Sequence, residues 1–206
     1  MTAALLPLLV TACGQEGELM TTGVSAIRSA CPAVAIPAGT GDITLFNPPT
    51  SRDASAIDVV ASMTNVRSTC TDDGANIVTN ATFEVQALRR DASGDRDVVI
   101  PYFGTVVQAG NSVVSKSIGR VALHFANGEL RASSTGSATS QVLRSAANLP
   151  EDIRAEVTRE RKAGEADAAV DPMADPKVRT AVQRASFELL VGFQLTADQL
   201  AYNATR

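Results

Sequence analysis

The sequence predicts a mainly β protein: an immunoglobulin-like antiparallel β-sandwich with a helical insertion before the last strand and a short C-terminal helix. Three observations lead to this prediction. Apolar and polar residues alternate in runs between residues 56 and 131, turn residues separate these runs, and one more alternating run follows a charged segment near the C-terminus. Hydrophobic residues make up 45% of the 206-residue chain and aromatic residues only 4%, so aliphatic side chains must build the core.

The first two predicted strands are short. Pro32 and Pro37 bound an apolar segment, and a strand flanked by prolines suits the edge of a sheet. A turn at residues 38–41 then leads to a second strand over residues 42–46, which ends at Asn47-Pro48-Pro49.

Four longer strands form the predicted centre of the sandwich. They span residues 57–70, 77–90, 98–108 and 113–125, the last as one strand or two. Three of them show an apolar face, formed by Ile57, Val59, Ala61 and Met63, by Phe83, Val85 and Ala87, and by Val121, Leu123 and Phe125. Turn residues such as Asn127-Gly128 separate the strands and predict hairpins.

The composition changes after these strands. Residues 132–140 are rich in Ser, Thr, Ala and Gly and predict a loop or an edge strand of weak register. A charged insert follows at about 150–175, in which Pro150 and the acids after it predict the start of a helix. Only Ile153 and Val157 form an apolar stripe on that helix, so we expect it to be exposed.

The C-terminal elements have the clearest patterns. Asp175 can cap a short helix that begins at Pro176. Residues 187–195 then alternate between apolar and mostly other side chains, with Leu190 as the exception, which predicts the last strand. Thr196-Ala197-Asp198-Gln199 matches a capping box and predicts a final helical turn through Tyr202.

The N-terminal residues predict export. An apolar run ends in Val10-Thr11-Ala12-Cys13, which resembles the lipobox of bacterial lipoproteins, where the cysteine receives a diacylglyceryl group and becomes the first residue after cleavage. We therefore expect residues 1–12 to be a lipoprotein signal peptide, truncated because no Lys or Arg precedes Arg28. Residues 13–30 would be a lipid-anchored tether, and residues 31–206 a single β-sandwich domain.

The three cysteines are consistent with export. If Cys13 carries lipid, Cys31 and Cys70 remain as a pair in an oxidising compartment, where disulfides persist. The alternatives are two buried free thiols and, for residues 3–12, a core segment of a cytosolic protein. A zinc site has little support because the cysteine spacing is wrong and His124 is the only histidine.

Charge and motifs argue against several classes of function. The net charge of −4 comes from 18 basic and 22 acidic residues that are mixed along the chain, and without a basic patch we expect no nucleic-acid partner. Alternation places His124 toward solvent, and no serine lies in a Gly-x-Ser-x-Gly motif, so we assign no catalytic residue.

Two further patterns each allow two interpretations. Acidic residues at 71–74 and 91–97 could ligate Ca²⁺, but turn chemistry explains both. Tyr102, Phe103 and Phe193 could form a binding platform, but packing in the core is the simpler interpretation. We accordingly assign no metal ligand and no cofactor-binding residue.

Five motifs carry a resemblance to a known family: Cys31-Pro32-Ala33-Val34, Asn65-Val66-Arg67-Ser68-Thr69-Cys70, Pro101-Tyr102-Phe103, Val191-Gly192-Phe193-Gln194-Leu195-Thr196 and Gln199-Leu200-Ala201-Tyr202-Asn203. Together they resemble a group of uncharacterised alphaproteobacterial outer-membrane lipoproteins. The resemblance covers residues 31–131 and 176–206, and implies a secreted, lipid-anchored β-domain with no assigned activity. Gly14 is also similar to the residue that follows the lipidated cysteine in lipoproteins sent to the outer membrane.

These observations lead us to expect a non-enzymatic protein of the cell envelope. It would be anchored to the outer membrane through a lipid on Cys13, face the periplasm, and act as an interaction or assembly module for an envelope protein. The charged insert is the first candidate for partner contact, because it has no evident role in the core. The alternative is a periplasmic domain that binds a small ligand or a glycan.

Overall fold

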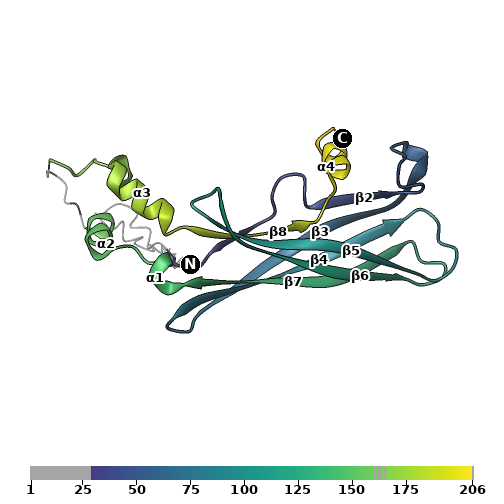
Figure 1. Cartoon of the computed structure of the whole chain (residues 1–206), viewed down its shortest axis with the longest axis horizontal. Coiled ribbons are helices and arrows are strands. Elements are labelled where there is room, and N and C mark those ends of the chain that lie inside the picture. The colour runs from purple at the N-terminus through teal and green to yellow at the C-terminus, as the bar shows by residue number, and fades with distance from the viewer. Residues whose placement is uncertain (1–28, 160, 162–163, 165, 206) are drawn as a thin grey trace, which may run out of the picture.

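The computed structural model describes residues 29–159, 161, 164 and 166–205, which form two stacked four-stranded sheets (Figure 1). The strand orders are β1-β8-β5-β6 in one sheet and β2-β3-β4-β7 in the other. Neighbouring strands are antiparallel except for the parallel pair β1 and β8. The strands are β1 (Ala33–Ala35), β2 (Asp42–Phe46), β3 (Ile57–Asp72), β4 (Asn76–Arg89), β5 (Arg96–Gln108), β6 (Ser112–Phe125), β7 (Arg131–Leu143) and β8 (Phe187–Phe193). The prediction of a mainly β sandwich is confirmed.

The helices lie outside the sandwich. Three of them follow β7, gather at one end of the sheets and lead into β8, so the helical insertion before the last strand is confirmed (Figure 1). The fourth follows β8 and lies beside β2. They are α1 (Arg144–Ala147), α2 (Glu151–Thr158), α3 (Pro176–Arg184) and α4 (Ala197–Thr205), with short 3-10 turns at η1 (Ala54–Ala56) and η2 (Pro172–Ala174).

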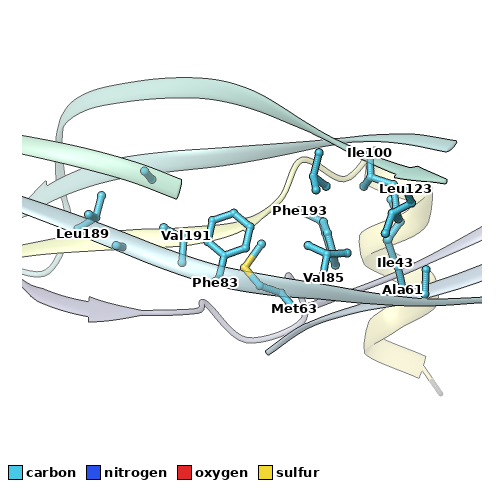
Figure 2. Close-up of a cluster of buried hydrophobic side chains, with 14 of the residues drawn as sticks. Ile43, Ala61, Met63, Phe83, Val85, Ile100, Leu123, Leu189, Val191 and Phe193 are labelled. Carbon is cyan, nitrogen blue, oxygen red and sulfur yellow. The ribbon is translucent and has the colours of Figure 1, made fainter. Parts of the chain in front are cut away.

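The core is formed by the apolar faces that the alternation predicted. Val59, Phe83, Val85 and Leu123 are each at most 1% exposed. Figure 2 shows side chains of β3 and β4 meeting those of β5, β6 and β8 between the sheets. Burial of such aliphatic side chains stabilises a fold by about 1.5–3 kcal/mol each, so this layer supplies most of the driving force.

Residues 132–140 form an edge strand, one of the two predicted alternatives, but its register is regular and not weak. β7 pairs with β4 over its whole length, from Arg131 opposite Leu88 to Leu143 opposite Asn76, without a register shift. The small residues have a packing role, because a Cβ atom on Gly136 would lie 2.5 Å from the ring of Phe83. Low sequence complexity therefore reflects the close packing of β7 against a large side chain.

The helix of the charged insert is largely exposed, as expected. α2 buries Ile153, which is 4% exposed, and the helix contacts α3. Asp152 and Lys177 join the two helices through an ion pair of 2.8 Å. The apolar stripe of α2 is narrow because it packs against one other helix and not against a sheet.

The two C-terminal helices begin with the predicted caps. The side chain of Asp175 accepts a hydrogen bond from the backbone N–H of Lys177 at the start of α3. Thr196 and Gln199 exchange the two hydrogen bonds of a capping box before α4. α4 continues to Thr205 rather than ending near Tyr202, whose ring packs edge-on against Phe46.

A buried arginine holds the connections at the end of the sandwich opposite α1–α3. Arg89, the last residue of β4, is 1% exposed, and its guanidinium lies 5.3 Å from the centre of the Phe125 ring. It donates hydrogen bonds to four backbone carbonyls, those of Glu129 (2.7 Å), Gly94 (2.9 Å), Ala92 (2.7 Å) and Ala126 (2.9 Å). These carbonyls belong to the β4–β5 and β6–β7 connections, so one side chain fixes two of the crossings between the sheets.

We predict that Arg89→Lys lowers the free energy of unfolding by about 2–4 kcal/mol, because a single ammonium group cannot satisfy four carbonyls arranged around a planar guanidinium. Urea unfolding monitored by circular dichroism measures this loss. Arg131→Lys, at an exposed position in β7, is the matched control and should change stability by less than about 0.5 kcal/mol. Equal stability of the two variants would contradict the role given to Arg89.

An ion pair joins the two sheets near the same end. Arg96 of β5 donates two hydrogen bonds to the carboxylate of Asp58 in β3, at 2.7 and 2.5 Å. These bonds hold the pKa of Asp58 below its usual range. The pair therefore stabilises the fold fully above the pKa of an unfolded aspartate, about 3.9, and loses this effect as the pH falls through the lower folded pKa.

We predict that Asp58→Asn lowers the free energy of unfolding by about 0.5–1 kcal/mol at pH 7, a modest effect because Arg96 is partly exposed. The difference from wild type should shrink as the pH falls below about 4, where the wild-type carboxylate also becomes neutral. Unfolding in urea at several pH values measures both effects. Asp53→Asn is the control, and a difference for Asp58→Asn that does not depend on pH would contradict the ion-pair explanation.

Candidate functional site

The two sheets approach each other closely where β5 faces β7. A Cβ atom on Gly104 of β5 would lie 2.8 Å from the Cβ atom of Ala138 on β7, so a larger residue would have to move the strands apart. Close by, the hydroxyl of Tyr102 donates a hydrogen bond of 2.8 Å to the carbonyl of Ser137. β5 therefore lies directly against the edge strand of the opposite sheet.

The first half of β6 extends beyond the opposite sheet. β6 is the next strand outward from β5, and all its residues from Ser112 to Ile118 are exposed, whichever face of the strand they occupy. In the second half of the strand, Val121, Leu123 and Phe125 are buried in the core. We call residues 112–118 the β6 overhang.

The β6 overhang exposes large apolar side chains. Val113, Val114 and Ile118 are 63%, 54% and 53% exposed, and Val99 of β5 on the same sheet is 55% exposed. Large apolar side chains that are exposed together on one part of a surface are a feature of protein interaction sites. The overhang is therefore the candidate functional site of the described residues.

Cations alternate with apolar residues on the outward face of β6. Because Val121, Leu123 and Phe125 point into the core, the residues between them point outward. The outward row is formed by Lys116, Ile118, Arg120, Ala122 and His124. The ammonium of Lys116 lies 5.4 Å from the centre of the Phe103 ring, and His124 pairs with Asp97 at 2.7 Å.

The outer face of the other sheet has a different chemistry. Its exposed residues on β4 and β7 are mostly hydroxyl and amide side chains, namely Thr82, Gln86, Ser133, Thr135, Ser137, Thr139 and Gln141. Two large apolar side chains, Leu88 and Leu143, are also exposed there, near opposite ends of the strands. The two outer faces of the sandwich therefore differ in degree: the central part of this face is polar, whereas cations and exposed apolar side chains follow one another along β6.

The overhang cannot be predicted directly from the sequence, because exposure of both strand faces depends on the opposite sheet. One pattern could have pointed to it. β6 contains no Asp or Glu in its 14 residues, and its basic residues recur at every fourth position. The alternation of apolar and polar residues in β6 predicts its core face, and the structure confirms that face.

Two of the three cysteines lie in the described part of the chain. Cys31 and Cys70 form a disulfide with a Cα–Cα distance of 6.1 Å. It ties the segment before β1 to β3 and so connects the two sheets at the end where α1–α3 lie. Cys13 and the expected signal peptide and tether up to residue 28 lie outside the described residues.

We predict that Cys31→Ala/Cys70→Ala lowers the free energy of unfolding by about 3–4 kcal/mol, because the crosslink closes a loop with a sequence separation of 39 residues. Urea unfolding of the double variant measures the loss, and reduction of the wild-type protein should reproduce it. The double variant should be insensitive to reductant. A wild-type midpoint that reduction leaves unchanged would contradict the prediction.

The aromatic residues divide between core and surface. Phe193 is fully buried, and Tyr102 packs edge-on against Phe83, as the core interpretation expected. Phe103 points to the outer face, where Gly192 leaves room for its ring. Only Phe103 therefore contributes to the surface around the β6 overhang.

The acidic turns are occupied by local hydrogen bonds. The carboxylate of Asp73 accepts hydrogen bonds from the backbone N–H groups of Ala75 and Asn76, and these bonds lower its pKa. Asp91 accepts from the N–H of Ser93 in the same way. Among the described residues no group of three or more His, Cys, Asp or Glu side chains could hold a metal ion.

A hollow of about 510 Å³ lies beside η1, between β3 and β4. Its polar groups already have partners, because Asp58 binds Arg96 and the guanidinium of Arg90 donates to the carbonyl of Ser55. The lining residues offer no set of free polar groups that converge on one point.

Comparisons with protein-family models, curated proteins and solved structures find no match for this chain. In the part of the chain that the structure describes, no helix combines the length and the apolar character needed to cross a membrane. The geometry of the site is thus the main basis for a proposal about function.

Proposed function

We propose that this protein is a non-enzymatic module of the bacterial cell envelope that binds another envelope protein through the face containing the β6 overhang. In this proposal a lipid on Cys13 anchors it to the outer membrane, with the sandwich in the periplasm. The exposure of Val113, Val114 and Ile118 on an overhanging edge strand is the observation that carries the proposal. Burial of these three side chains in an interface would supply favourable apolar contact.

Because of this exposure we propose β6 as the site of partner contact, in place of the charged insert that the sequence had favoured. Within the insert, α2 packs on α3, and the described arginines bind acids of the same segment, as in the pair of Arg161 and Glu156 at 2.9 Å. Mixed charges that are already paired add little to binding. The apolar residues of β6 have no comparable cover among the described residues.

Binding of a small ligand or glycan has less support. The hollow beside η1 has its polar groups engaged, and a specific ligand needs a few free polar groups that fix its orientation. We therefore favour binding to a protein over binding to a small molecule.

The immunoglobulin-like character of the sandwich is part of the proposal. Two packed sheets of about seven strands are typical of that group. The strand order β2-β3-β4-β7 places three consecutive strands side by side, whereas the corresponding immunoglobulin sheet brings strands B and E together. The likeness we propose is thus one of architecture and not of strand order.

Lipidation is tested by metabolic labelling with a fatty-acid analogue. We predict that the wild-type protein takes up the label and that Cys13→Ser abolishes it, because the thioether to the lipid requires the cysteine. Cys31→Ala/Cys70→Ala is the matched control and should keep the label. A mature protein whose mass retains Met1 would contradict anchoring through Cys13.

Partner binding is tested by a photo-crosslinking amino acid placed at Ile118 or at Thr135 in cells. Both positions are exposed, the first on the face containing β6 and the second on the polar face. We predict a discrete crosslinked protein from position 118 and none from position 135. The same adducts from both positions, or none from position 118, would contradict the proposal.

A further inference from the structure

The edge of β6 is open to a further strand. β6 is the last strand of its sheet, so its backbone N–H and C=O groups that point away from β5 have no ladder partner among the described residues. An edge strand of this kind is a template for pairing with another chain. The other long edge strand, β7, carries mainly Ser and Thr and faces β5 directly at Ala138.

The cations of β6 determine which side chains a strand paired with it can carry. Lys116 and Arg120 lie four residues apart on the outward face, with Ile118 midway between them. Neither cation pairs with a carboxylate among the described residues, in contrast to His124, which is held by Asp97. A strand added beside β6 would place three of its own side chains directly opposite these three residues.

We propose that the β6 edge, from Ser112 to Arg120, binds an extended segment of the partner protein by strand addition. This segment carries two carboxylates four residues apart, with an apolar residue midway between them. The carboxylates lie opposite Lys116 and Arg120, the apolar residue packs on Ile118, and main-chain hydrogen bonds complete the ladder. Because the spacing is symmetric, the match holds for either strand direction. This inference rests on the proposed function and names the chemistry of the partner.

A second copy of this chain fits the edge poorly. β6 contains no acidic residue, so pairing two copies through this stretch adds cations to one ladder without any carboxylate to offset them. Lysine on an edge strand is a common protection against self-association. The cations therefore act against self-pairing and in favour of an acidic partner.

The test uses two peptides and the mature protein. The acidic probe is the peptide TVTETVTETVT with a C-terminal amide and a fluorophore on its N-terminus, and the basic control replaces both glutamates by lysine and carries the same fluorophore. Fluorescence anisotropy at low ionic strength should show the acidic peptide binding at least about tenfold more tightly than the basic peptide. Nuclear magnetic resonance should place the largest shift changes in residues 112–120.

Variants separate charge from backbone pairing. Lys116→Glu/Arg120→Glu should reverse the preference between the two peptides, whereas Arg131→Glu, an exposed cation on β7, should leave it unchanged. N-methylation of the acidic peptide along one edge should weaken binding about tenfold or more, because it removes ladder hydrogen bonds.

Equal binding of the two peptides, no binding of the acidic peptide at millimolar concentration, or dimerisation of the protein through β6 would each overturn the inference. A discrete adduct from Ile118 in cells combined with any of these results would leave the proposed function standing and remove only the strand-addition mode. Failure of the cellular crosslink would instead remove the proposed function itself.

Discussion

The contact between Gly104 and Ala138 is the constraint on which the candidate site depends. It seats β5 against β7, the edge strand of the opposite sheet, at a distance that only glycine permits. The next strand outward, β6, is exposed over its first half, whereas Val121, Leu123 and Phe125 of its second half lie in the core. Exposure of Val113, Val114 and Ile118 thus follows from the packing of two other strands.

The contacts that hold the two sheets together lie away from the open edge of β6. Arg89 holds two of the crossing connections at one end through four carbonyls, and the disulfide between Cys31 and Cys70 joins the sheets at the other. Neither device uses the first half of β6. The binding surface and the stabilising contacts therefore lie in different places, so a partner could bind β6 without disturbing the contacts that hold the sheets together.

The sequence predicted what depends on local periodicity and missed what depends on the opposite sheet. Alternation located the core faces of β3, β4 and β6, and the caps at Asp175 and Thr196 located two helix starts. The regular pairing of β7 was not predicted, because its small residues make room for the ring of Phe83 on the neighbouring strand. This packing depends on two strands together and not on the sequence of one. The β6 overhang and the four-carbonyl site of Arg89 were missed for the same reason, since both depend on where distant segments meet.

Backbone hydrogen exchange of the mature protein, followed residue by residue, shows whether the edge of β6 is open. If the β6 edge is open, the amides of residues 112–118 that point away from β5 exchange nearly as fast as unstructured amides, while those of β4, which has a strand on each side, are strongly protected. Strong protection of every amide in residues 112–118 of the isolated monomer would show that the edge is covered, and would contradict the account.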